Sequence, residues 1–132
     1  MNVLDEIVLS TKSKLEVMKS KTSLEELISQ VTKLKIEKSN FKASLASKDQ
    51  AIIAEIKKAS PSAGIISEDF DPVTKAKEYE SFGASALSIL TEEDYFLGSI
   101  KYLKDVKAIS NLPILRKDFV IDEYQIYESK LI

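Results

Sequence analysis

The chain contains neither cysteine nor histidine among its 132 residues. The absence of cysteine excludes disulfide bonds, thiolate nucleophiles and cysteine metal sites. The absence of histidine removes the most common general base and the most common metal ligand. Acid–base chemistry in this chain therefore falls to lysine, glutamate, aspartate or tyrosine side chains.

Long runs of one residue class are also missing. No stretch approaches the roughly 20 apolar residues of a membrane span, and the first residues have no apolar core of the signal-peptide type. No long basic run is present, and the net charge is −2, so we expect neither a membrane nor a nucleic-acid partner. With 44% hydrophobic and 30% charged residues, the composition is typical of a globular protein, which we expect in the cytoplasm.

The first 48 residues are predicted to form helices. Apolar residues recur at helical spacing over residues 2–20. A second helix is predicted to begin after Thr22 or Ser23 as its N-cap, and a third to cover residues 40–46. We interpret this segment as a helical extension that packs on the rest of the protein. The alternative is an independent helix that binds a partner.

Strands and amphipathic helices alternate from residue 49 to residue 132. Strands are predicted at residues 51–56, 86–91 and 113–119, and helices at residues 72–82, 98–110 and 123–132. Such alternation predicts an α/β fold in which parallel strands are joined by right-handed crossovers. Three strands with helices on one face leave an open sheet with two bare edges, so we expect the domain to be incomplete.

Charged residues occupy the carboxyl ends of the first and third predicted strands. Since side chains alternate along a strand, Glu55 and Lys57 share one face, and Lys117 lies on the corresponding face of the third strand. The carboxyl ends of parallel strands are where active sites lie in open sheets and barrels. These three residues are therefore candidate catalytic residues. The alternative is that the lysines are solvated strand ends and that Glu55 simply pairs with a neighbouring lysine.

Three motifs resemble one enzyme family. EIKKASPS begins at Glu55, LTEEDYF ends at Phe96, and LRKDF ends at Phe119, in an order and at a spacing similar to those of indole-3-glycerol phosphate synthases. The resemblance runs from about Asp49 to the last residue, and weaker similarity covers the helical extension. It implies a (β/α)₈ TIM barrel, of which residues 1–48 are the N-terminal extension and residues 49–132 the first three βα units.

The resemblance also implies a reaction and its residues. The family converts 1-(2-carboxyphenylamino)-1-deoxyribulose 5-phosphate to indole-3-glycerol phosphate, with loss of carbon dioxide and water, and needs no cofactor or metal. By resemblance, Lys117 is the general acid that protonates the substrate carbonyl, Lys57 engages the anionic substrate, and Glu55 is the glutamate beside it. The residues implied to contact substrate are Ser62 in the loop after the first strand, and Phe96 and Phe119 in the anthranilate pocket.

The resemblance further implies that some functional groups lie outside these residues. The family's general-base glutamate and its phosphate site belong to later strands, so we expect residues 1–132 alone to be inactive. Two alternatives remain open. One is another phosphate-binding barrel enzyme, such as phosphoribosylanthranilate isomerase. The other is a non-catalytic fragment that self-associates through its open sheet edges.

Overall fold

The computed structural model describes every residue from Met1 to Ile132 and divides into two compact units. One unit consists of residues 38–118 and holds the sheet, and the other consists of residues 1–37 together with residues 119–132. No helix in either unit combines the length and the apolar character that a bilayer span requires.

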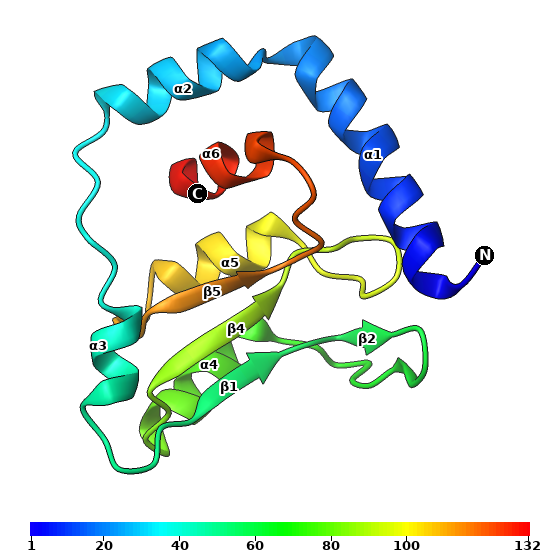
Figure 1. The fold of residues 1–132 in the computed structure, drawn as a ribbon. Helices are drawn as coiled ribbons and strands as arrows, with labels where there is room; N and C mark the ends of the chain where they lie inside the picture. Colours follow the sequence, from blue (N-terminus) through cyan, green and yellow to red (C-terminus); the bar gives the residue numbers. More distant parts are fainter. The chain divides into compact units, whose positions relative to one another are not determined.

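The sheet unit contains most of the elements in Figure 1. In chain order they are α3 (Phe41–Ala46), β1 (Ile53–Ile56), β2 (Ala59–Ser60), β3 (Gly64–Ile65), α4 (Pro72–Ser81), β4 (Ala86–Leu90), α5 (Ile100–Lys107) and β5 (Ile114–Lys117). The predicted strands and helices of this region are confirmed, although β1, β5 and α5 are shorter than predicted. The α/β class is therefore confirmed as well.

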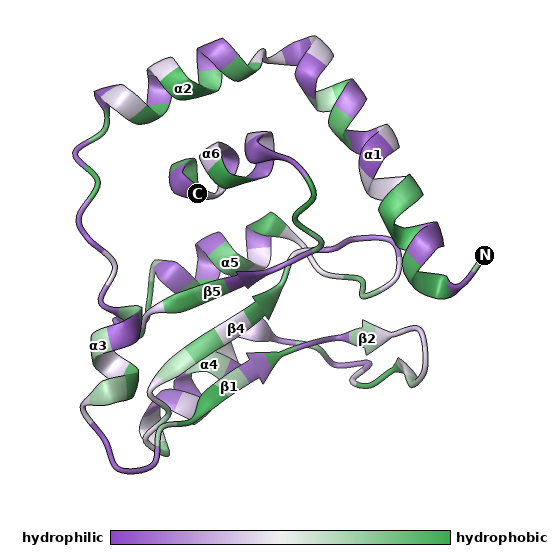
Figure 2. Cartoon of the chain, viewed as in Figure 1, coloured by the Kyte–Doolittle hydropathy of each residue, from purple (hydrophilic) through white to green (hydrophobic).

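The main sheet has three parallel strands in the order β1-β4-β5. Its register pairs Glu55 with Ser88, and Ser88 in turn with Leu115. Residues paired in this way point to the same face of a parallel sheet, so these three side chains share a face. Figure 2 shows that β1 and β5 both change from hydrophobic to hydrophilic toward their carboxyl ends.

Helices α4 and α5 cover the other face of the sheet. Helix α4 packs against β1, and α5 packs against β4 and β5. Ile56, Leu87 and Ile89 form the centre of this layer with at most 1% of their surface exposed. Burial of such side chains stabilises the fold by about 1.5–3 kcal/mol each. The hydroxyl of Tyr79 on α4 adds a hydrogen bond of 3.0 Å to the carbonyl of Glu55, which fixes the helix against the strand.

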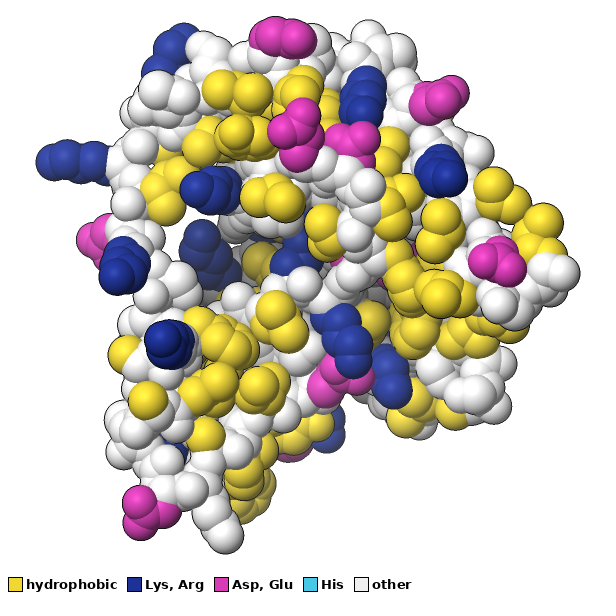
Figure 3. Space-filling model, in the orientation of Figure 1, with side chains coloured by type: hydrophobic (Ala, Val, Ile, Leu, Met, Phe, Trp, Pro, Cys, Tyr) yellow, Lys and Arg dark blue, Asp and Glu magenta, His cyan; other side chains and the backbone are white.

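The face away from these helices carries exposed apolar side chains. Ile53 on β1 and Leu115 on β5 are each 44% exposed, and Figure 3 shows hydrophobic side chains at the surface among charged ones. Ile52 precedes β1 and is 60% exposed, because the alternation of buried and exposed faces begins only where the strand does.

The segment after β1, expected from the sequence only as a loop, forms a small hairpin. Strands β2 and β3 pair antiparallel, with Ala59 opposite Ile65 and Ser60 opposite Gly64. Gly64 adopts a φ of 63°, a left-handed conformation that glycine accepts at no steric cost. Two residue pairs give too short a pattern for alternation to be visible in the sequence.

The second unit consists of three helices. They are α1 (Val3–Lys21), α2 (Leu24–Lys33) and α6 (Glu123–Leu131). Leu15, Leu27 and Tyr124 form its buried core. Ser23, one of the two predicted N-caps, accepts a hydrogen bond of 3.1 Å from the amide of Glu26. Asp122 caps α6 in a capping box and also accepts from Lys19 Nζ at 2.7 Å, which ties α6 to α1.

Candidate functional site

Glu55 lies at the centre of a polar cluster at the carboxyl end of the sheet. Its Oε2 atom accepts a hydrogen bond of 2.7 Å from Lys117 Nζ and one of 3.1 Å from Ser88 Oγ. Its Oε1 atom lies 3.7 Å from Lys57 Nζ. The structure therefore brings together the three residues predicted from strand parity, on the face away from the helices.

Strand register explains why the three charged groups meet. Lys117 is paired with Leu90, two residues beyond Ser88 on β4, and therefore lies on the same face as Glu55. The side chain of Ser88 is short, which leaves room for Lys117 to reach over β4 to the carboxylate on β1. Sequence reasoning missed Ser88, although a serine inside the apolar run ALSIL was a visible signal.

The surroundings of Glu55 lower the pKa of its carboxyl group below the ordinary value of 4.5. Partial burial raises this pKa, but the hydrogen bonds from Lys117 and Ser88 and the charges of the two lysines lower it by more. With two ammonium groups around one carboxylate, the cluster carries net positive charge, and it is only partly buried. It can therefore attract an anionic ligand at this end of the sheet.

A cavity of about 600 Å³ opens beside β1. Glu55 and Lys57 contribute to its wall, together with residues of the loop before α4 and of α4 itself, but Lys117 does not. Lys117 thus joins the cluster through Glu55 and does not line this cavity. No group of three or more aspartate and glutamate side chains is arranged to hold a metal ion.

Ser62 lies in the loop between β2 and β3, away from the direct contacts of Glu55. Its side chain is exposed, and its Oγ lies 3.4 Å from Oγ of Ser60. Ser60 is buried and also accepts a hydrogen bond from the amide of Ala63 at 3.1 Å. Ser60 therefore holds the loop in place, and Ser62 is presented to solvent next to it.

Phe96 lies in the loop between β4 and α5 and is half-buried. Its amide donates to Oε2 of Glu92 at 2.9 Å. Phe119 follows β5 and belongs to the helical unit, where its carbonyl accepts from Nε2 of Gln125 at 2.8 Å. The structure thus groups Glu55, Lys57 and Lys117 directly, whereas Ser62 and Phe96 lie in separate loops of the same unit.

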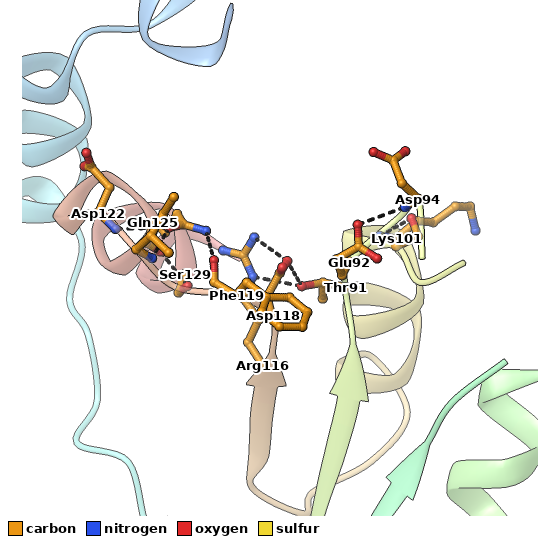
Figure 4. A network of polar contacts seen from close by, with 12 residues as sticks. Thr91, Glu92, Asp94, Lys101, Arg116, Asp118, Phe119, Asp122, Gln125 and Ser129 are labelled. Carbon is orange, nitrogen blue, oxygen red and sulfur yellow. Dashed lines mark hydrogen bonds and ion pairs between the residues drawn. The ribbon is translucent and has the colours of Figure 1, made fainter. Parts of the chain in front are cut away.

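A second polar network fixes the end of β5. Arg116 Nε donates to Thr91 Oγ1 at 3.1 Å, and Thr91 Oγ1 donates to Asp118 Oδ2 at 2.6 Å. The guanidinium of Arg116 also lies 3.5 Å from this carboxylate, and both side chains are 11% exposed. Figure 4 shows the three side chains turned toward one another. Because Arg116 and Asp118 flank Lys117 on both sides, this network fixes the backbone from which Lys117 projects.

Comparison with known proteins identifies sequence relatives over nearly the whole chain. The model of the family described as indole-3-glycerol phosphate synthase matches residues 4–132. A protein of that name from Clostridium acetobutylicum is 51% identical over 130 residues, which are 98% of this chain and 50% of the relative. One from Ruminiclostridium cellulolyticum is 52% identical, with 98% of this chain and 50% of the relative covered. The chain thus spans about half the length of the curated relatives it matches.

Proposed function

This chain belongs to the indole-3-glycerol phosphate synthase family, and from this premise we propose that it contributes part of the active site of such an enzyme. The reaction is the conversion of 1-(2-carboxyphenylamino)-1-deoxyribulose 5-phosphate to indole-3-glycerol phosphate, with loss of carbon dioxide and water. The observation that carries the proposal is the cluster of Glu55, Lys57 and Lys117 at the carboxyl ends of parallel strands.

The fold agrees with the position of this cluster. The family fold is a (β/α)₈ barrel, and the three parallel strands with their helices are part of such a barrel. Catalytic groups of these barrels lie at the carboxyl ends of the strands. Within the proposal, residues 1–48 are the N-terminal extension and residues 49–132 the first three βα units.

The three charged residues have distinct proposed roles. Lys117 is the general acid that donates a proton to the substrate carbonyl as the ring closes, since its side chain is 52% exposed and can reach a ligand. Lys57 attracts the anionic groups of the substrate. Glu55 accepts the hydrogen bond from Lys117 and thereby fixes the position of the ammonium group before substrate arrives.

The apolar and hydroxyl residues complete the proposed substrate contacts. Phe96 and Phe119 pack against the anthranilate ring, and Ser62 contacts the substrate from the loop between β2 and β3. The reaction needs acid–base groups and charge stabilisation, which lysine and glutamate supply, so the proposal includes no metal and no cofactor.

The substrate class of the proposed reaction follows from the family. A phosphorylated small molecule is the ligand of this family, and the family match favours the synthase over phosphoribosylanthranilate isomerase. A cytoplasmic location, the absence of a nucleic-acid or membrane partner, and self-association of the isolated chain remain predictions.

A fused synthase tests the proposed function. In it, residues 1–132 are followed by the remaining half of the Clostridium acetobutylicum relative, of which this chain covers 50%. We expect the fused synthase to form indole-3-glycerol phosphate, detected by indole fluorescence, and Lys117→Ala to abolish most of the turnover. The exposed Lys101 on α5, which pairs with Asp105, provides the control Lys101→Ala, which should retain activity. A folded fused synthase without turnover would contradict the proposal.

A further inference from the structure

Glu92 is a buried carboxylate at the start of the loop that follows β4. Only 4% of the surface of Glu92 is exposed. Oε1 accepts a hydrogen bond of 3.0 Å from the amide of Asp94, and Oε2 accepts from the amides of Tyr95 and Phe96 at 2.7 and 2.9 Å. One carboxylate thus accepts hydrogen bonds from three consecutive backbone amides, and Figure 4 shows its contact with Asp94.

The backbone closes the same loop from its other end. The amide of Gly98 donates to the carbonyl of Glu92 at 2.7 Å. A Cβ atom at Gly98 would collide with the carbonyl of Leu90, so the chain can pass here only without a side chain. Leu97, just before it, has a φ of 51°, a conformation that costs energy in a non-glycine residue. Both ends of the loop are therefore held at Glu92, and the loop has little freedom to move.

A carboxylate suits this arrangement better than any other side chain. Two oxygens that act only as acceptors can receive three amide protons, and charged acceptors form stronger hydrogen bonds than neutral ones. An amide group of the same shape has one oxygen and one NH₂ donor, so it would present a donor to at least one backbone amide. Burial strengthens these bonds and makes the loss of a partner costly.

We propose that Glu92 is a positioning residue that sets the place of Phe96, and through it the affinity of the site for the aromatic part of the substrate. Glu92 itself touches no substrate in this role. It acts on the backbone of Phe96, whose amide it binds directly. The inference rests on the proposed function only where it assigns Phe96 to the aromatic part of the substrate, and the anchoring of the loop is independent of that assignment.

Hydrogen exchange in the fused synthase tests the anchoring, because the isolated chain is expected to self-associate or unfold easily. In Glu92→Gln, we expect the amides of Asp94, Tyr95 and Phe96 to exchange at least about tenfold faster, since hydrogen bonds to a charged acceptor protect backbone amides more strongly than those to a neutral one. The control is Glu93→Gln, because Glu93 is the exposed neighbour and its variant should exchange as the unchanged chain does. In Glu92→Asp, which keeps the charge on a shorter side chain, the exchange rates of the three amides should lie between those of Glu92→Gln and Glu93→Gln.

Two results of this experiment would overturn the inference. Unchanged exchange of the three amides in Glu92→Gln would mean that the carboxylate does not hold the loop. Equal loss of protection at Leu87 and Ile89 in the middle of β4 would assign Glu92 to general stability and not to positioning.

Kinetics of the fused synthase test the link to substrate. Glu92→Gln should raise KM for the substrate about tenfold, while inhibition by ribulose 5-phosphate, which lacks the aromatic ring, should change less than about twofold. Glu93→Gln should leave both values unchanged. An equal loss of affinity for both ligands would overturn the assignment to the aromatic part. An inactive fused synthase would instead overturn the proposed function, and the exchange experiment would still decide whether Glu92 anchors the loop.

Discussion

Lys117 and Glu55 form a hydrogen bond of 2.7 Å although a whole strand lies between them. Lys117 ends β5 and Glu55 belongs to β1, and β4 separates the two strands. Neighbouring strands are about 4.8 Å apart, so the lysine spans roughly twice that distance above the sheet. The contact therefore depends on both the length of lysine and the small residue on the strand it crosses.

The pKa of Glu55 should respond to this contact. Because its pKa is lowered in the folded chain, Glu55 contributes stability that is present above its ordinary value of 4.5 and is lost as the pH falls through the folded value. Lys117→Met should raise the Glu55 pKa, since partial burial then acts with less opposition. Lys57→Met should raise it less, because only the charge of Lys57 contributes. NMR titration of the Glu55 carboxyl carbon in the fused synthase measures both shifts.

A lysine outside the cluster provides the control for this titration. Lys75 on α4 pairs with Glu78, and Lys75→Met should leave the Glu55 titration unchanged. A Glu55 pKa that stays the same in Lys117→Met would contradict the hydrogen bond between the two side chains.

Ser88 should control whether Lys117 can reach Glu55. Ser88→Val places a branched side chain under the lysine and removes the hydrogen bond to Oε2, so we expect a raised Glu55 pKa and a cost of about 1–3 kcal/mol in unfolding free energy from overpacking. Ser88→Ala keeps the space and loses only the 3.1 Å hydrogen bond. The alanine variant should reduce kcat/KM of the fused synthase about two- to tenfold.

The comparison of the two Ser88 variants distinguishes the effect of side-chain volume at this position from the effect of the hydrogen bond to Glu55. If valine and alanine have the same effect on the Glu55 titration, room above β4 is not what allows the contact. Urea denaturation measures the difference in unfolding free energy between the two variants, and NMR measures the titration of Glu55.

The two site lysines should differ in their kinetic effects. Lys117→Ala should lower kcat of the fused synthase about 10²- to 10⁴-fold with a smaller change in KM, as expected for loss of a positioned general acid. Lys57→Ala should change both kcat and KM, because its charge acts on the substrate in every state. A Lys117→Ala enzyme with nearly normal kcat and only a raised KM would reassign Lys117 to substrate binding.

The isolated 132-residue chain should show no synthase turnover and should self-associate or unfold easily. Ile53 and Leu115 are each 44% exposed on the uncovered face of the sheet, and each exposed apolar side chain forfeits about 1.5–3 kcal/mol. The net stability of a domain is only about 5–15 kcal/mol. Analytical ultracentrifugation and the fluorescence assay on one sample measure both properties. Normal turnover by a monomer would contradict this expectation.

A charged substitution tests which surface is responsible for self-association of the isolated chain. Leu115→Lys should reduce self-association if the uncovered face drives it, whereas Phe82→Lys, at an 87% exposed site after α4, should not. Equal behaviour of the two variants would point to the sheet edges instead.

The sequence by itself determined the local structure and the family. Hydrophobic periodicity, the N-cap signal at Ser23 and the strand pattern are local signals, and the elements they predict are present. Strand parity also predicted that Glu55, Lys57 and Lys117 share a face, because side-chain direction along a strand depends only on the count of residues.

Only the tertiary structure decided how these residues interact. That Lys117 contacts Glu55 across β4 depends on the strand order and on the register of Ser88, which no local pattern encodes. The same holds for Glu92, whose position in the sequence resembles that of the exposed Glu93 beside it. Its burial and its three amide contacts arise from the path of the loop, in which Gly98 packs closely against the carbonyl of Leu90.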